Sequence, residues 1–192
     1  MGENRPEELA ELEMRARWAL EHPEQLKPRE AIEAYRPMLR LWHFPAFFDY
    51  TCWAVLKPAQ HKMSGLSLVV RKVIWERTTD LRRFADPLEW LKQGHRAPPT
   101  IVVRDPRMPA DQFTTLLAEV ALAPVPAAGI KERWSLDGER FGFENLESGF
   151  LQVRLEWWCD GPDEWQAFTR CVARMRAALE QCFSAGDRYE TR

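Results

Sequence analysis

The chain has 192 residues, of which 45% are hydrophobic and 29% are charged, and its net charge is −2 at pH 7. This balance excludes wholesale disorder, and the length suits a single domain. No segment approaches the roughly 20 apolar residues that a membrane-spanning helix needs. The first residues are polar and acidic, unlike those of a signal peptide, so we expect a cytoplasmic protein without membrane contact.

The first 43 residues are predicted to form a helical arm. Apolar residues at three- and four-residue steps predict a first helix over residues 6–21, which ends before Pro23. Similar spacing over residues 28–42 predicts a second helix, which Pro37 should kink or split.

The next part of the chain turns from helix to strand. Aromatic and β-branched residues predict strands over residues 50–57 and 66–77. The second of these segments is almost continuously apolar, which favours a central strand that is covered on both faces.

Two helices and a strand follow in the middle of the chain. A short helix is expected over residues 86–91, with Asp86 as its N-cap and proline at its first position. A short strand over residues 100–103 precedes a longer amphipathic helix over residues 109–122.

The last third predicts a small antiparallel meander and then one amphipathic helix. The Asp137-Gly138 dipeptide suits the tight turn of a hairpin. Apolar residues at three- and four-residue steps predict the helix over residues 165–183. Three strands are expected, over residues 130–136, 141–143 and 150–158.

This order of elements predicts an α+β fold. We expect a mainly antiparallel sheet with helices packed against it, an N-terminal helical arm and a C-terminal amphipathic helix. The chain is then one domain, with the arm over residues 1–43, the core over residues 44–183 and a mobile tail over residues 184–192.

Charge is distributed unevenly along the chain. Residues 36–107 carry thirteen Lys and Arg against six Asp and Glu, whereas the segments on either side are acidic. These blocks compensate one another if they pack together; alternatively, the basic middle segment binds an acidic partner or a nucleic-acid backbone. The cations available for such binding are Arg71, Lys72, Arg82, Arg83, Arg96, Arg104 and Arg107.

The sequence contains no catalytic motif. It lacks the glycine-rich phosphate loops, the nucleophile elbow and the paired histidines of zinc enzymes, and no cofactor or metal is expected. One alternative is an enzyme of unknown class with a site near His61 and His95, set against Cys52 and scattered carboxylates.

A binding surface is the favoured interpretation. By strand alternation, Trp158 lies on the face opposite to Trp157. An exposed tryptophan beside carboxylates is typical of protein interfaces. The partner-binding side chains are therefore predicted to be Trp158 and the acidic residues Glu144, Glu147, Glu156 and Asp160.

The same region carries a resemblance. Leu136-Asp137-Gly138, the aromatic strand that follows, residues 155–158 and Gly161-Pro162 with Trp165 together resemble uncharacterised bacterial proteins. Some of these are similar to immunity proteins of contact- or secretion-delivered toxins. The resemblance covers about the last 55 residues. It implies a small, cytoplasmic, non-enzymatic protein that blocks one toxin.

Overall fold

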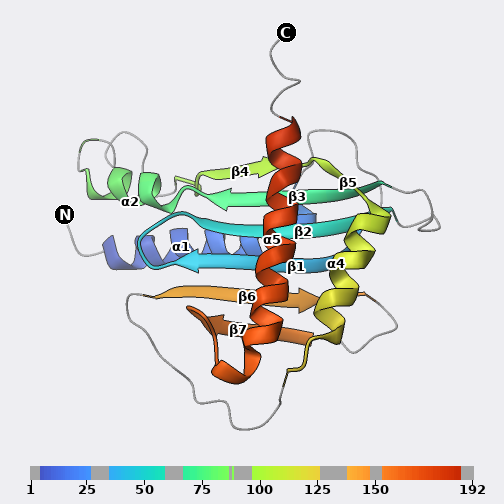
Figure 1. The fold of residues 1–192 in the computed structure, drawn as a ribbon. Helices are drawn as coiled ribbons and strands as arrows, with labels where there is room; N and C mark the ends of the chain where they lie inside the picture. The colour runs from blue at the N-terminus through green and yellow to red at the C-terminus, as the bar shows by residue number, and fades with distance from the viewer. Residues whose placement is uncertain are drawn as a thin grey trace.

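A computed structural model describes most of the chain. The described residues are 5–26, 35–58, 67–86, 88, 97–125, 138–147 and 153–186. Within them, seven strands form one antiparallel sheet, and helices pack on both of its faces (Figure 1). The predicted α+β fold is confirmed.

The described elements are four α-helices, two 3-10 turns and seven strands. The helices are α1 (Arg5–Glu21), α2 (Arg77–Ala85), α4 (Ala110–Leu122) and α5 (Gln166–Gly186), with short 3-10 turns η1 (Pro23–Gln25) and η2 (Asp163–Trp165). The strands are β1 (Tyr35–Pro45), β2 (Tyr50–Pro58), β3 (Ser67–Trp75), β4 (Ile101–Arg104), β5 (Arg107–Pro109), β6 (Glu139–Asn145) and β7 (Val153–Trp158).

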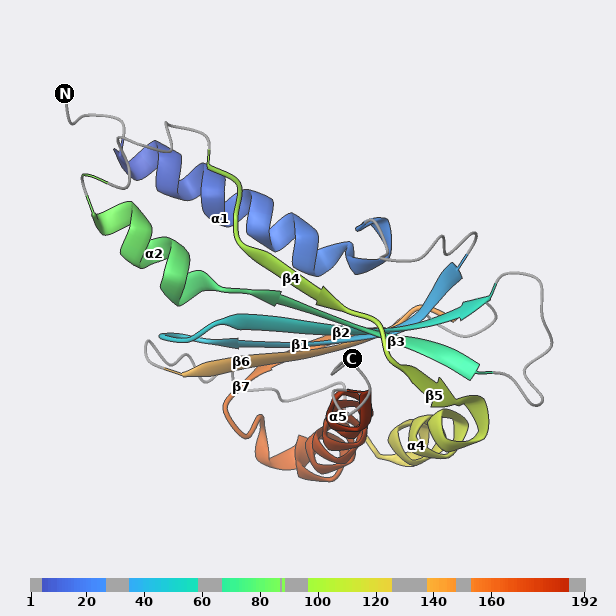
Figure 2. The same cartoon turned by 90° about the horizontal axis from the view of Figure 1, so that it is seen from above.

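The sheet has the strand order β4-β3-β2-β1-β6-β7, and β5 pairs with the other end of β3. Helices α1 and α2 lie on one side of the sheet, and α4 and α5 lie on the other (Figure 2). We name these two sides the α1 face and the α5 face. None of the described helices is long and apolar enough to cross a membrane.

The α5 face holds the larger hydrophobic core. Helix α5 buries one stripe against it, as the spacing of its apolar residues predicts. Phe168 packs edge-on against both Phe143 of β6 and Trp157 of β7. The stripe consists of Phe168, Val172, Met175, Leu179 and Phe183, with Trp165 just before it.

The prediction of a second helix over residues 28–42 is wrong where the chain is described. Residues 35–45 form β1, a strand inside the sheet, so the expected helical arm does not extend to residue 43. From Met38 onward, strand β1 is covered on both faces, and only Arg40 and His43 of this part stay partly exposed. Its buried pairs therefore recur every three residues, which imitates the spacing of a helix.

Several smaller expectations have different outcomes. Strands β2, β3, β4 and β6, the end of β7 and helix α4 form where predicted, whereas α2 and β5 were not expected. The predicted strand over 130–136 lies outside the described residues, as does most of the predicted helix over 86–91. Asp86 does accept a hydrogen bond from the amide of Leu88, as an N-cap would. Helix α5 runs to Gly186, into the expected tail.

The α1 face holds a second cluster of buried residues. Ala16 and Leu20 of α1 pack on Trp42, Cys52 and Trp75 of the sheet. The Trp42 indole lies directly over Gly142 of the neighbouring strand. A Cβ atom at Gly142 would lie 1.8 Å from Cε2 of Trp42, so this position requires glycine.

Buried charge fixes the segments around this second cluster. Arg71 is only 2% exposed; its Nε and Nη2 donate to the two carboxylate oxygens of Asp105 at 2.7 and 2.8 Å. Its Nη1 donates to the carbonyl oxygens of Pro23 and Leu26, at 3.0 and 2.9 Å. A β3 arginine thus attaches η1 to the sheet.

Candidate functional site

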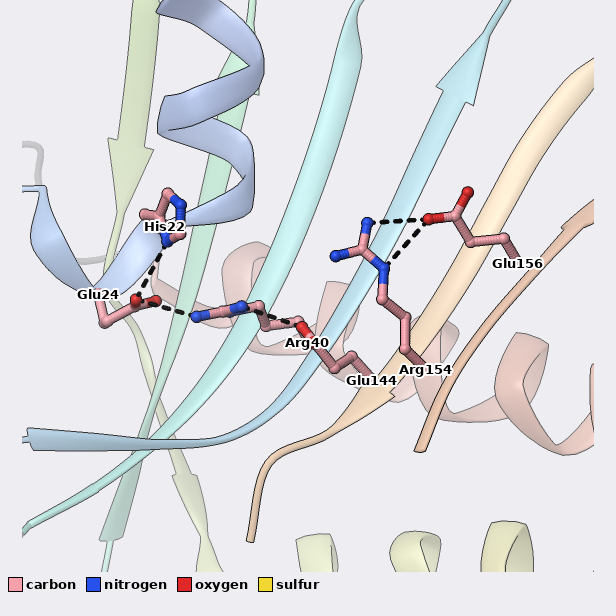
Figure 3. Close-up of polar contacts among 6 residues, drawn as sticks. All are labelled: His22, Glu24, Arg40, Glu144, Arg154 and Glu156. Atoms are coloured by element: carbon pink, nitrogen blue, oxygen red, sulfur yellow. Dashed lines mark hydrogen bonds and ion pairs between the residues drawn. The ribbon is translucent and has the colours of Figure 1, made fainter. Parts of the chain in front are cut away.

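A row of alternating charges crosses the α1 face from η1 to β7 (Figure 3). At its centre, Arg40 of β1 donates from Nη2 to Glu24 and from Nη1 to Glu144, both at 2.9 Å. The side chains of all three are less than one-fifth exposed. Because each charge has a close partner of opposite sign, this part of the row is a structural link between η1, β1 and β6.

The outer part of the row lies on β6 and β7 and is open to solvent. Arg154 donates to Glu156 at 2.9 Å, and Nη1 of Arg140 lies 3.7 Å from the same carboxylate. The guanidinium groups of Arg154 and Arg140 also lie over the rings of Trp42 and Phe44, at 4.8 and 5.1 Å from the ring centroids. The sheet surface here is therefore aromatic rings covered by arginines.

Trp158 ends β7 on this same surface. It pairs with Arg140 across the sheet, and it is half-buried, whereas Trp157 points into the α5 core. The β1–β2 hairpin turns at the same end of the sheet, since Pro45 pairs with Glu139 at the start of β6.

Two adjacent phenylalanines, Phe47 and Phe48, form the tip of that hairpin and are 66% and 68% exposed. Large apolar side chains that stand next to each other in solvent are unusual unless they contact a partner. We name this set of residues the aromatic end: Phe47, Phe48, Arg140, Glu156 and Trp158.

The four predicted acidic residues do not all lie near Trp158. Glu156 is the nearest, whereas Glu144 belongs to the buried link with Arg40. Glu147 follows the far end of β6, where Lys57 donates to it at 2.6 Å. Asp160 is exposed in the turn after β7. The predicted acidic residues are thus divided between the two ends of β6 and β7.

The described residues do not include His61 and His95, the two histidines of the alternative enzyme site. Cys52 is buried in the α1-face cluster, and burial raises the pKa of its thiol, which opposes thiolate chemistry. Among the described residues, no group of three or more His, Cys, Asp and Glu side chains could hold a metal ion.

The basic middle segment makes several ion pairs with the acidic ends of the chain. Lys72 lies 2.6 Å from Glu180 of α5, and Arg77 lies 3.6 Å from Glu13 of α1. Arg71 is instead buried against Asp105 of the middle segment itself. Of the other cations predicted for nucleic-acid binding, Arg83 lies near Asp80, and Arg96 lies outside the described residues. These pairings favour compensation within the fold.

The α5 face contains a cavity of about 420 Å³ that the sequence did not indicate. It lies between α5 and the strands β1, β6 and β7, beside the apolar stripe. Its lining includes Phe141, Trp157, Thr169, Arg170, Ala173 and Arg176. Sequence reasoning missed it because its two sides come from separate segments, the strands on one side and α5 on the other, whose packing no local pattern indicates.

His43 contacts Phe141, one of the residues that line this cavity. Its ring stacks on Phe141 with the centroids 4.5 Å apart, and its Nε2 lies 3.2 Å from a carboxylate oxygen of Glu139. Burial and the nearby charge of Arg176 lower the pKa of His43, although Glu139 acts in the opposite direction. The imidazole is therefore neutral at pH 7.

Comparisons with known proteins assign the chain to no family. No protein family, no curated protein and no solved structure matches the chain. The function must therefore be argued from the fold and its surface.

Proposed function

We propose that the chain is a non-enzymatic protein-binding module that captures its partner with the aromatic end. The observation that carries this proposal is the position of Trp158. It stands half-buried at the same end of the sheet as the exposed Phe47 and Phe48, beside Arg140 and Glu156.

This composition is the one that protein interfaces favour. Tryptophan, phenylalanine and arginine are enriched at the centres of interfaces, and charged groups at their rims. Trp158 is partly held by its own sheet, so little side-chain entropy is lost when a partner covers it. The arginine–glutamate pairs around it supply charges that orient the partner.

We further propose that the partner is a toxin, and that the protein is an immunity-type inhibitor acting in the bacterial cytoplasm. The resemblance of the last third to immunity proteins supports this, and that third supplies Trp158. Such an inhibitor needs no catalytic group of its own, because it acts by covering a surface of the toxin.

The test begins with capture of the partner. The tagged protein is incubated with native lysate at low and moderate salt, and the bound material is identified. We expect one stoichiometric protein, such as a toxin encoded beside this chain. Recovery of nucleic acid that moderate salt removes would instead support binding through the basic middle segment, and would contradict the proposal.

Variants then locate the interface. Trp158→Ala should weaken capture by about 2 kcal/mol, or roughly thirtyfold, while the unfolding temperature stays nearly unchanged. The matched control is Trp18→Ala, because Trp18 of α1 is 48% exposed and its ring meets that of His22 at a tilt of 49°. Equal losses for both variants, or no loss for either, would refute the aromatic end as the interface.

A further inference from the structure

The cavity on the α5 face has a specific origin in the sequence of α5. Thr169 and Ala173 lie one turn apart on the flank next to the apolar stripe, and Arg176 continues the same flank. The first two are small, and they line the cavity together with Phe141 and Trp157. The result is a cavity with an aromatic floor and a helical wall.

The cation in this wall has no carboxylate partner among the described residues. The Arg176 guanidinium lies 5.1 Å from the centroid of the Phe141 ring. Elsewhere in the fold, Arg40, Arg71 and Arg154 each bind a carboxylate. Arg176 therefore keeps its hydrogen-bond donors available to a ligand in the cavity.

The other charged groups around the cavity have defined positions. Arg170, farther toward the start of α5, donates from Nε to the carbonyl oxygen of Gln166 at 3.0 Å and adds a second positive charge. On the sheet side, Glu139 faces His43, and Asp160 is exposed in the turn after β7. The positive potential is thus concentrated on the α5 side of the cavity.

We propose that this cavity is a binding site for a small aromatic carboxylate. The ring of the ligand lies in the cavity against Trp157, Thr169 and Ala173. Its carboxylate accepts two hydrogen bonds from the planar guanidinium of Arg176, which lies over Phe141. A volume of about 420 Å³ lies within the usual range for small-molecule sites and admits a bicyclic ring. The site does not depend on the proposed protein interface, since Trp158 lies on the opposite face.

The first experiment compares two matched probes. Indole-3-carboxylate and its neutral amide are titrated into the full-length protein, and binding is followed by ligand-observed NMR. We expect the acid to bind about tenfold more tightly than the amide, because only the acid forms a charge-assisted pair with Arg176. Equal affinities, or no binding of either probe at millimolar concentration, would overturn the proposal.

Variants of two neighbouring arginines separate a specific contact from general charge. Arg176→Gln should remove the preference for the acid, and Arg176→Lys should restore part of it. The control is Arg174→Gln, since Arg174 pairs with Glu119 of α4 and does not line the cavity. If Arg174→Gln lowers the affinity as much as Arg176→Gln does, the probe binds to the general field of the helix and the site is refuted.

Variants of two alanines test the cavity itself. Ala173→Phe should fill the space and abolish binding of both probes, whereas Ala177→Phe, at an exposed position outside the cavity, should leave binding intact. Circular dichroism verifies that both variants fold. Binding that survives Ala173→Phe would contradict the proposal. Trp158→Ala should not affect either probe, so the failure of one proposal can be distinguished from the failure of the other.

Discussion

The two faces of the sheet are built from different kinds of contact. On the α5 face, the helix is held by an apolar stripe that meets rings of β6 and β7, such as Phe168 against Phe143 and Trp157. On the α1 face, helix α1 packs on a smaller apolar cluster, and Arg40 and Arg71 donate hydrogen bonds to η1. The same strands thus present a mainly apolar surface on one side and a surface with buried ion pairs on the other.

The two kinds of contact position the segments that cover the sheet in different ways. Apolar burial is strong but has little direction, so the α5 position depends on the shapes of the packed side chains. Buried ion pairs add little net stability, because desolvation opposes their attraction. They do have direction: Arg40 and Arg71 each accept only one placement of η1, so we infer that charge sets the register of the N-terminal segment.

The largest expected effect tests the apolar packing on the α5 face. Phe168→Ala should lower the free energy of unfolding by about 4 kcal/mol, because it removes buried apolar surface and leaves a cavity between α5 and the sheet. Urea denaturation followed by circular dichroism measures this difference. A loss below about 1 kcal/mol would mean that the α5 stripe is not the main source of stability.

The next effect tests the buried ion pairs on the α1 face. Arg40→Met should cost about 3 kcal/mol, because Glu24 and Glu144 are then left buried without their cation. The triple variant Glu24→Gln, Arg40→Met, Glu144→Gln removes all three charges, and it should recover most of that loss in the same assay. If the triple variant is no more stable than the single one, the row contributes through packing instead of charge.

A pH titration tests whether the folded protein holds His43, which stacks on the cavity residue Phe141, in its neutral form. The pKa of His43 is lowered in the folded state, whereas the unfolded chain binds the proton near the ordinary value of 6.5. The stability that the neutral imidazole retains above pH 6.5 should therefore be lost as the pH falls from 6.5 through the lower folded pKa. His43→Gln should reduce this pH dependence of the free energy of unfolding. Urea denaturation measures it between about pH 7.5 and about pH 5, a range that extends about one unit or more on either side of the ordinary pKa.

A matched variant controls for the loss of an imidazole in general. His22→Gln changes a histidine on the other face, at the end of α1, and should leave the pH dependence from His43 in place. Identical profiles for the wild type and His43→Gln would show that this histidine is not held neutral by its surroundings.

The smallest effect contrasts an exposed ion pair with the buried row. Glu119 and Arg174 join α4 to α5 at 3.1 Å, but both side chains are largely exposed. Water and salt screen such a pair, so Glu119→Gln should be indistinguishable from wild type in thermal unfolding. A clear loss would show that the edge of the α5 face also depends on charge.

The sequence predicts best the elements whose burial follows one simple period. The α5 stripe repeats every three or four residues because that helix buries one side only, and all five of its members are buried as expected. Alternation in β7 also places Trp157 and Trp158 on opposite faces correctly. In both cases the local pattern and the tertiary environment agree.

The sequence fails for β1 and α2, whose local patterns do not reflect their surroundings. Strand β1 is buried on both faces, so its pattern loses the alternation of a strand and is mistaken for a helix. Helix α2 is short and polar, and its buried residue is Asp80. That carboxylate accepts hydrogen bonds from the Trp75 indole and from Thr100, contacts that no local periodicity could indicate.

The functional surface was predictable only in part, for the same reason. Trp158 and Glu156 follow from the alternation of β7, and the structure places them on one surface. The roles of Glu144 and Glu147 depend on Arg40 and Lys57, which lie about a hundred residues earlier in β1 and β2. Since β1 was predicted to be a helix, its arginine could not be placed beside them.

The pairing of β1 with β6 also has a consequence for the order of folding. Arg40 and Glu144 are 104 residues apart, yet they meet in adjacent strands. Strands β1, β2 and β3 follow one another and can pair as soon as they leave the ribosome, whereas β1 keeps an open edge until β6 has been synthesised. Such long-range pairing slows folding and exposes hydrogen-bonding groups to other chains. We therefore expect the last third of the chain to act as the closing step of folding, which protects a nascent sheet that would otherwise be prone to aggregate.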